Sequence, residues 1–149
     1  DPKNKQMSVE TELFLYLAAR AQLVSEVIRP ALEKGVVVIS DRFEDSTVVY
    51  QGYAGGFPPA KLKKMASEAR GNLAPRLTFL LDVNTKEGLR RSGRKDRMEH
   101  KSFEFHQKIR RGYLALAKAE PKRFAVISTH APKREVKKEI EAVLSRFFG

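Results

Sequence analysis

The sequence predicts an α/β protein in which helices cover both faces of a parallel sheet. Three short apolar segments lack the polar–apolar alternation of a half-buried strand, as expected for strands covered on both sides: residues 36–40, 77–83 and 124–128. Stretches with the period of an amphipathic helix separate these segments, so strands and helices alternate along the chain. This order predicts a three-layer α/β domain with parallel strands.

Capping residues and apolar stripes predict the helices. Ser8 is placed to cap a first helix, which Pro30 ends or kinks before Gly35. Later segments of helical period are the stretch after Pro58 and Pro59, a short helix from Asn84, a long helix through Phe105–Leu116 and a last helix through Val136–Phe147.

Length and composition limit the class of protein. The 149 residues, 42% hydrophobic and 32% charged, are typical of one globular domain over residues 1–149. No apolar run approaches the roughly 20 residues that span a bilayer, so we expect a cytoplasmic protein without a membrane partner. The chain has no cysteine, which excludes disulfides and thiolate chemistry. Its histidines are not spaced as metal ligands, so we expect no metal bound directly by the protein.

Asp41 and Arg42 follow the first predicted strand directly, and a polar stretch with Tyr50 and Gly56, expected to be a loop, comes after them. Ligands of parallel α/β sheets bind outside the carboxyl ends of the strands, so the acid–base pair marks a candidate ligand site. The alternative is that the two side chains pair with each other or cap the next helix.

Tyr16 and Arg20 are four residues apart and therefore project from one face of the first helix. They could be a core aromatic residue and an ordinary ion-pair partner. Together with the segment after Asp41, an aromatic face and a five-donor guanidinium suit a planar base with carbonyl acceptors.

The segment from Arg90 to Lys101 is strongly basic around Gly93, in a chain with 29 Lys and Arg against 18 Asp and Glu and a net charge of +11. Such a segment can close over a nucleotide as a lid, because arginine forks stabilise the charge on a transferring phosphoryl group. The alternative is a basic surface for nucleic-acid phosphates.

These segments occur in the order and spacing of bacterial thymidylate kinases. The similar stretches are ETELFLYLAARAQLVSEVIRPALEKG, DRFEDSTVVYQGYAGG, RRSGRKDRME and FHQKIRRGYLALA, and the resemblance covers nearly the whole chain. It implies the nucleoside monophosphate kinase version of the P-loop NTPase fold. It also implies transfer of the ATP γ-phosphoryl group to dTMP with Mg²⁺, in a homodimer and without a nucleic-acid partner.

The resemblance also implies roles for individual residues. On the acceptor side Tyr16 would stack on thymine, Arg20 would bond a base carbonyl, Ser46 and Thr47 would approach the base edge, and Tyr50 and Gln51 would line the sugar. Around the phosphates Arg42 would hold the acceptor phosphate, Asp41 would organise the Mg²⁺ region, possibly through water, and Arg91, Arg94 and Arg97 would be lid arginines.

The chain departs from the family in one respect. No G-x-x-x-x-G-K-[ST] phosphate loop occurs between Asp1 and Gly149, so the chain resembles the family without its amino-terminal part. We therefore expect negligible dTMP kinase activity from this chain alone and unpaired edges on the strands at 36–40 and 77–83. The family often has Asp where this chain has Ser128, near the adenine. The alternative function is a noncatalytic nucleotide- or nucleic-acid-binding module.

Overall fold

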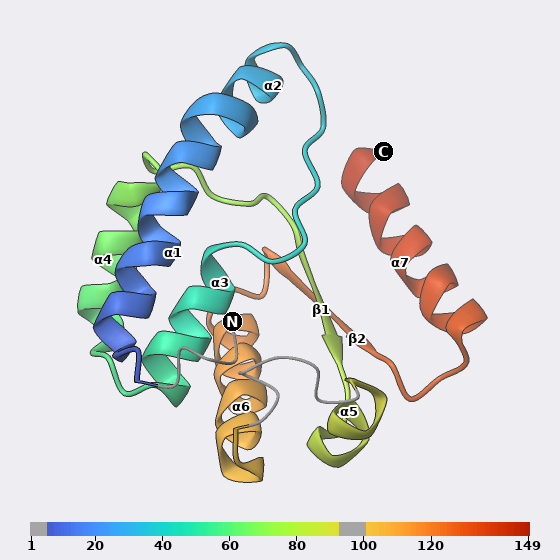
Figure 1. Cartoon of the computed structure of the whole chain (residues 1–149). Helices are drawn as coiled ribbons and strands as arrows, with labels where there is room; N and C mark the ends of the chain where they lie inside the picture. The colour runs from blue at the N-terminus through green and yellow to red at the C-terminus, as the bar shows by residue number, and fades with distance from the viewer. Residues whose placement is uncertain (1–5, 93–100) are drawn as a thin grey trace. The chain divides into compact units, whose positions relative to one another are not determined.

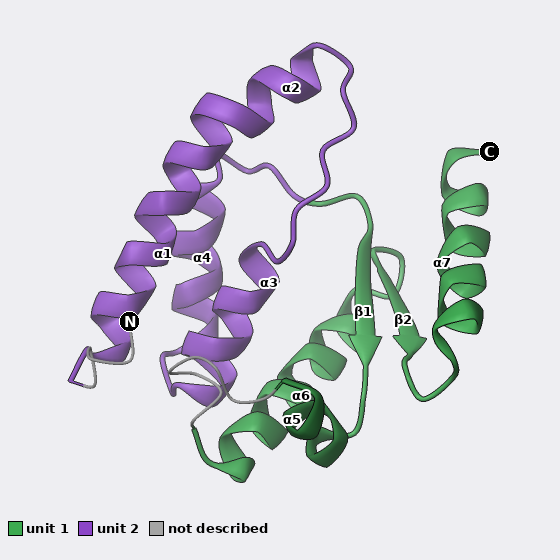
Figure 2. Ribbon diagram, turned by 45° about the vertical axis from the view of Figure 1, so that its right-hand side comes forward, with its two compact units in different colours: residues 1–2, 75–149 green, residues 3–74 purple. Residues whose placement is uncertain are grey.

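The computed structural model describes residues 6–92 and 101–149. Figure 2 shows that the chain divides between Ala74 and Pro75 into two compact units, and each unit has its own buried apolar residues. Unit 2 precedes this point and is helical, whereas unit 1 follows it and contains the sheet. The single domain predicted for residues 1–149 stays a prediction.

The first helix of unit 2 begins where the sequence predicts. Helix α1 (Val9–Leu23) is capped by Ser8, whose Oγ accepts a hydrogen bond of 3.1 Å from the Thr11 amide. It continues through the π-helical turn η1 (Val24–Ile28) into α2 (Arg29–Glu33). Pro30 therefore does not end the helix; the π turn lies directly before this residue, which has no N–H to donate to the helix. The helix ends before Gly35, whose φ is +73°.

The loop predicted after Asp41 is wrong, because this segment is helical. Helix α3 (Glu44–Thr47) runs directly into the π-helical segment η2 (Val48–Ala54). Glu44 and Asp45 lie in the first turn, where acidic side chains interact favourably with the helix dipole. Burial of Val48 and Val49 supplies the apolar face that the sequence reading overlooked.

Helix α4 (Pro59–Ala69) completes unit 2 and follows Pro58 as predicted. It packs against both α1 and η2, which places α1, α3 and α4 side by side in Figure 1. Leu13 of α1, Val49 of η2 and Leu62 and Ala66 of α4 are fully buried in this unit. None of the described helices is long and apolar enough to cross a membrane.

The strand predicted at residues 36–40 is wrong for the structure described. This segment is extended but pairs with no described strand, and Val36, Val37 and Ile39 are exposed, Ile39 by 92%. A strand requires a hydrogen-bonded neighbour, whereas a helix satisfies its backbone within one segment. Residues 36–40 thus have the apolar composition of a strand covered on both faces, but they lack the hydrogen-bonded neighbour that a strand requires.

Unit 1 contains the parallel strands. Strands β1 (Thr78–Asp82) and β2 (Phe124–Ser128) pair in parallel, with Thr78 opposite Phe124 and Asp82 opposite Ser128. Both strands lie where the sequence predicts them.

Three helices accompany this sheet: α5 (Thr85–Ser92), α6 (Phe103–Ala119) and α7 (Lys133–Phe148). Helix α6 contacts both strands and α7 contacts β2, and Figures 1 and 2 both draw these two helices on opposite sides of the sheet. Parallel strands packed with helices confirm the predicted α/β class, although Leu81 of β1 and Val126 of β2 are exposed by 51% and 44%.

The core of unit 2 can be tested with two leucines of one helix. Leu13 is 0% exposed and Leu15 is 56% exposed. We expect Leu13→Ala to lower the free energy of unfolding by about 2–5 kcal/mol, because it leaves a cavity, and Leu15→Ala to change it by no more than about 0.5 kcal/mol. Urea unfolding followed by circular dichroism measures both. Equal losses in the two variants would contradict the assignment of the core.

Candidate functional site

Two helix faces in unit 2 meet through side-chain hydrogen bonds. Glu12, Tyr16 and Arg20 are spaced by four residues on α1 and share one of its faces. Thr47 ends α3 and Gln51 lies four residues later in η2. Arg20 Nη1 donates to Thr47 Oγ1 at 2.9 Å, and Gln51 Nε2 donates to Glu12 Oε2 at 2.8 Å. The two faces are therefore joined at both ends in antiparallel register, with Tyr16 midway on α1; we call this group the helix-pair face.

Arg20 is held more firmly than a surface arginine. Its second amino group donates to the carbonyl of Phe43 at 3.0 Å, and its Cζ lies 5.2 Å from the centroid of the Phe43 ring. Burial lowers the pKa of Arg20 below its ordinary value, whereas the charges of Glu44 and Asp45 raise it. The guanidinium stays charged and is a rigid donor at one end of the helix-pair face.

Gln51 supplies a buried acceptor at the other end. Its side chain is among the fully buried ones, and the residue is only 2% exposed. While Nε2 is bonded to Glu12, Oε1 is buried and has no hydrogen-bond partner among the described residues. A buried carbonyl oxygen without a partner is uncommon, and a bound water, ion or ligand donor would satisfy it.

Arg42 adopts a backbone conformation that is rare outside glycine. Its φ is +64°, and the Ser40 hydroxyl donates to its carbonyl oxygen at 2.7 Å. Its guanidinium lies against Tyr50, with Nη1 3.4 Å from the phenol oxygen and Cζ 5.4 Å from the ring centroid. Asn72 shares this left-handed backbone, with a φ of +61°, and the role predicted for Arg42 and its exposed neighbour Asp41 stays a prediction.

An ion pair fixes the helix that carries these groups. Arg70, at the end of α4, pairs through Nε with Glu44 in the first turn of α3, and both side chains are largely buried. Arg70 Nη1 also donates to the Leu73 carbonyl at 2.7 Å. The first turn of α3, which contains the half-buried Ser46, is thereby tied to α4. The residues predicted to bind the acceptor nucleotide all lie on α1, α3 or η2: Tyr16, Arg20, Ser46, Thr47, Tyr50 and Gln51.

Arg91 belongs to unit 1, where it joins α5 to the segment after β2. Its Nε donates to Glu87 Oε1 at 2.8 Å, and its two amino groups lie 3.3 Å and 3.4 Å from the Thr129 carbonyl oxygen. Hydrogen bonds from Arg90 and Arg91 lower the pKa of Glu87 to about 2. The other predicted lid arginines, Arg94 and Arg97, lie outside the described residues, as does most of the predicted lid at 90–101.

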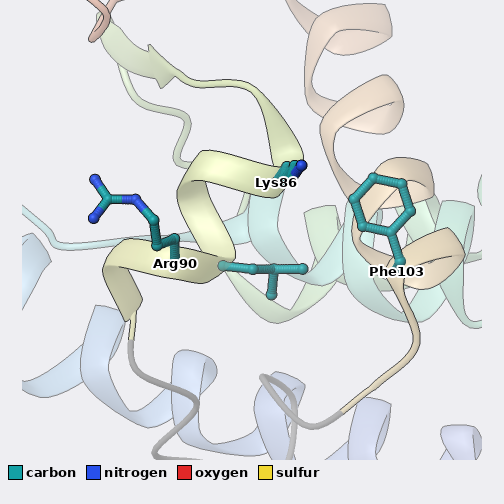
Figure 3. A pocket seen from close by; sticks show the side chains of 4 residues that line it. Lys86, Arg90 and Phe103 are labelled. Atoms are coloured by element: carbon teal, nitrogen blue, oxygen red, sulfur yellow. The ribbon is translucent and has the colours of Figure 1, made fainter.

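A shallow hollow lies near the same helix. It is lined by Lys86, Leu89 and Arg90 of α5 and by Phe103 at the start of α6. Figure 3 shows the Arg90 guanidinium pointing away from Phe103, and this group is bonded to Glu87 at 2.7 Å and 2.8 Å. Among the described residues, the lining includes Arg90 of the predicted lid segment but none of the individually predicted site residues.

Sequence reasoning missed two polar groups. Glu12 completes the four-residue spacing with Tyr16 and Arg20, and this pattern alone could have identified it. The second is Asp82, at the carboxyl end of β1, which Arg110 of α6 holds through two hydrogen bonds of 2.7 Å and 2.8 Å. A pair separated by 28 residues leaves no local sequence signal.

Known proteins show the same fold. A solved structure of thymidylate kinase from Ehrlichia chaffeensis matches with a TM-score of 0.77 and 28% identity, covering 96% of this chain and 68% of that one. This likeness, over nearly the whole chain, gives the protein the α/β fold of a nucleotide kinase.

Sequence comparison identifies the kinase family. The thymidylate kinase family model matches residues 2–140. The thymidylate kinase of Symbiobacterium thermophilum is 50% identical, covering 99% of this chain and 72% of that protein. That of Desulfovibrio desulfuricans is 44% identical over 98% of this chain and 74% of that protein. The chain belongs to the thymidylate kinase family, whose members are nucleoside monophosphate kinases and therefore transferases.

Asp82 makes the stability of unit 1 depend on pH. The hydrogen bonds from Arg110 hold the pKa of Asp82 below its ordinary value of 3.8. The charged carboxylate therefore stabilises the fold above this value, and the stabilisation is lost as the pH falls through the folded-state pKa. We expect Asp82→Asn to lower the free energy of unfolding by about 1 kcal/mol near pH 7, allowing for the solvent exposure of Arg110, and by less below about pH 3.8.

Urea unfolding between pH 7 and pH 3 measures this dependence. Glu141→Gln is the matched control, because Glu141 forms only an exposed 3.6 Å pair with Lys137. It should have little effect at any pH in this range. A loss in Asp82→Asn that does not change with pH would show that the carboxylate charge is not the stabilising feature.

Proposed function

We propose that unit 2 binds dTMP through the helix-pair face and thereby forms the acceptor site for the ATP γ-phosphoryl transfer that thymidylate kinases carry out. The observation that supports this most strongly is the fixed arginine donor at one end of the face and the buried acceptor at the other. Thymine offers carbonyl acceptors and one N–H donor, which matches Arg20 and Gln51, so we place Gln51 at the base rather than at the sugar to which the resemblance assigns it. Tyr16, half exposed between them, provides an aromatic surface for a planar base.

The neighbouring residues suit the rest of the nucleotide. Ser46 and Thr47 would approach the base edge, and Thr47 is already fixed by its bond from Arg20. Tyr50 would lie beneath the deoxyribose, with its ring against the Arg42 guanidinium. Arg42 would hold the acceptor phosphate, because its forked donors match phosphate oxygens and its unusual backbone fixes where they point.

Phosphoryl transfer in this class of kinase depends on positioning and neutralisation of charge rather than on covalent catalysis. Arg91, together with Arg94 and Arg97, would stabilise charge on the transferring group. Asp41 is an exposed carboxylate beside Arg42 and would organise the Mg²⁺ and phosphate region through water rather than as a direct ligand. The described residues contain no cluster of three or more metal-binding side chains, so phosphate oxygens and water would complete the coordination. Bound Mg²⁺ would neutralise phosphate charge.

We also propose a cytoplasmic homodimer. Helix α1 exposes Phe14 and Leu15 by more than half of their surface, and these side chains could pack against a second copy.

The net charge of +11 favours the alternative function, nucleic-acid binding. Oligonucleotide affinity that falls steeply with salt and is not reduced by dTMP would favour that alternative.

The base assignment predicts the effect of removing Arg20. We expect wild-type protein to bind dTMP more tightly than AMP or GMP, and Arg20→Ala to weaken dTMP binding by roughly 1–3 kcal/mol through loss of a charged donor. Isothermal titration calorimetry measures both. Arg29→Ala is the control, because Arg29 lies on the same continuous helix but bonds the Gly71 carbonyl instead. Purine monophosphates binding as tightly as dTMP would exclude the assignment.

The phosphate assignment predicts a different pattern for Arg42. We expect Arg42→Gln to weaken binding of dTMP at least tenfold and to leave binding of thymidine, which has no phosphate, almost unchanged. Arg42→Lys keeps the charge without the fork and should lie between wild type and Arg42→Gln. Calorimetry with the two ligands separates these effects. Equal weakening of dTMP and thymidine would place Arg42 at the nucleoside instead.

A further inference from the structure

We propose that Glu12 is a positioning residue for base specificity, which acts by fixing the orientation of the Gln51 amide. This inference rests on the proposed binding of dTMP at the helix-pair face. Glu12 does not contact the base in this proposal. It determines which polar atom of Gln51 faces the ligand.

The hydrogen bond between these side chains permits only one amide orientation. An ionised carboxylate accepts hydrogen bonds and cannot donate them, so the amide nitrogen of Gln51 must face Glu12. The Nε2–Oε2 distance of 2.8 Å is that of a good hydrogen bond. Because Gln51 is fully buried, solvent cannot replace Glu12 when the amide turns over. The reversed orientation would direct Oε1 at the carboxylate oxygens and is strongly unfavourable.

With Nε2 bonded to Glu12, Oε1 is the polar atom of Gln51 that remains available to accept a hydrogen bond. It is buried and has no hydrogen-bond partner among the described residues, although Nε2 of the same amide is paired. Thr47 and Gln51 are four residues apart in one continuous helical segment, so Oε1 belongs to the face whose other end receives the Arg20 bond. The helix-pair face thus combines a fixed donor with a fixed acceptor.

This acceptor distinguishes pyrimidines by one ring position. Thymine and uracil have an N–H donor at N3, which a carbonyl oxygen accepts. Cytosine has a bare nitrogen acceptor at N3, so Oε1 and the base would meet as two acceptors, both unpaired and buried. An amide free to turn over would present its NH₂ group and accommodate cytosine. By fixing the Gln51 amide, Glu12 therefore favours thymine and also disfavours cytosine.

The rival explanation is that Glu12 only ties α1 to η2. A substitution that retains size and hydrogen bonding separates the two explanations. Glu12→Gln keeps a bonding partner for Gln51, but its side-chain amide both donates and accepts, so both orientations of Gln51 become possible. A structural role alone predicts no change in the preference between bases. The positioning role predicts that this preference falls.

The experiment is calorimetry on the full chain with dTMP and 5-methyl-dCMP, which share the methyl group, the sugar and the phosphate. We expect Glu12→Gln to reduce the ratio of their dissociation constants by about tenfold, with the midpoint of urea unfolding nearly unchanged. Glu10→Gln is the matched control, since Glu10 is an exposed glutamate in the first turn of the same helix. It removes the same charge and should leave the ratio unchanged.

Two further measurements on wild-type protein keep the test decisive if Glu12→Gln does not fold. The Gln51 side-chain NH₂ resonances should be protected from hydrogen exchange both with and without dTMP, because Nε2 stays bonded to Glu12. Loss of this protection on binding dTMP would overturn the inference. The 3′-deoxy analogue of dTMP should lose little affinity; a large loss would assign Oε1 to the sugar hydroxyl and also overturn it.

The outcomes separate this inference from the proposed function. If wild type prefers dTMP and Glu12→Gln keeps the full preference over 5-methyl-dCMP, the positioning role of Glu12 is wrong and the dTMP site stands. If wild type binds purine monophosphates as tightly as dTMP, the proposed function is wrong and the inference falls with it.

Discussion

The hydrogen bond from Arg20 to Thr47 is the interaction on which the candidate site depends. It joins α1 to α3 through a partly buried guanidinium that also lies near the charges of Glu44 and Asp45. The same guanidinium bonds the Phe43 carbonyl, directly before α3 begins, so the start of that helix is fixed by a residue 23 positions away. Tyr50 and Gln51 lie in η2, which continues α3, so the position of α3 determines theirs. Removal of Arg20 would therefore alter both the donor and the segment that carries the acceptor.

A strongly basic chain also needs its few carboxylates in specific places. Glu44 pairs with Arg70, Asp82 with Arg110 and Glu87 with Arg90 and Arg91. Each pair joins different elements or fixes the end of one, whereas surface pairs such as Lys137–Glu141 add little stability. The arginines are thus divided into those that hold the fold and those, such as Arg42, whose donors face a proposed ligand.

The sequence predicted local features well and distant ones poorly. The Ser8 cap, the helix after Pro58 and the strand ending at Ser128 all depend on nearby residues, and they lie where expected. The four-residue spacing predicts that Tyr16 and Arg20 share one face of a helix. It does not predict the partners of Arg20, because no periodicity relates Arg20 to residues 43–47. The segment 44–54 is helical, although its polar and glycine residues are typical of a loop. Its only apolar signal in the sequence is the short pair Val48 and Val49, which is too little to predict a helix.

The unpaired segment at 36–40 and the proposed base site depend on different kinds of backbone hydrogen bonding. A strand depends on a neighbour elsewhere in the chain, and this segment has none among the described residues. Helices α1 and α3–η2 satisfy their own backbones, so their side chains meet through Glu12–Gln51 and Arg20–Thr47 whether or not residues 36–40 pair. If the proposed roles are right, binding of the base depends on these helices, whereas Arg42 at the phosphate side follows the unpaired segment. Base preference should survive changes at the phosphate side that abolish phosphoryl transfer, which makes binding the more direct measure of this site.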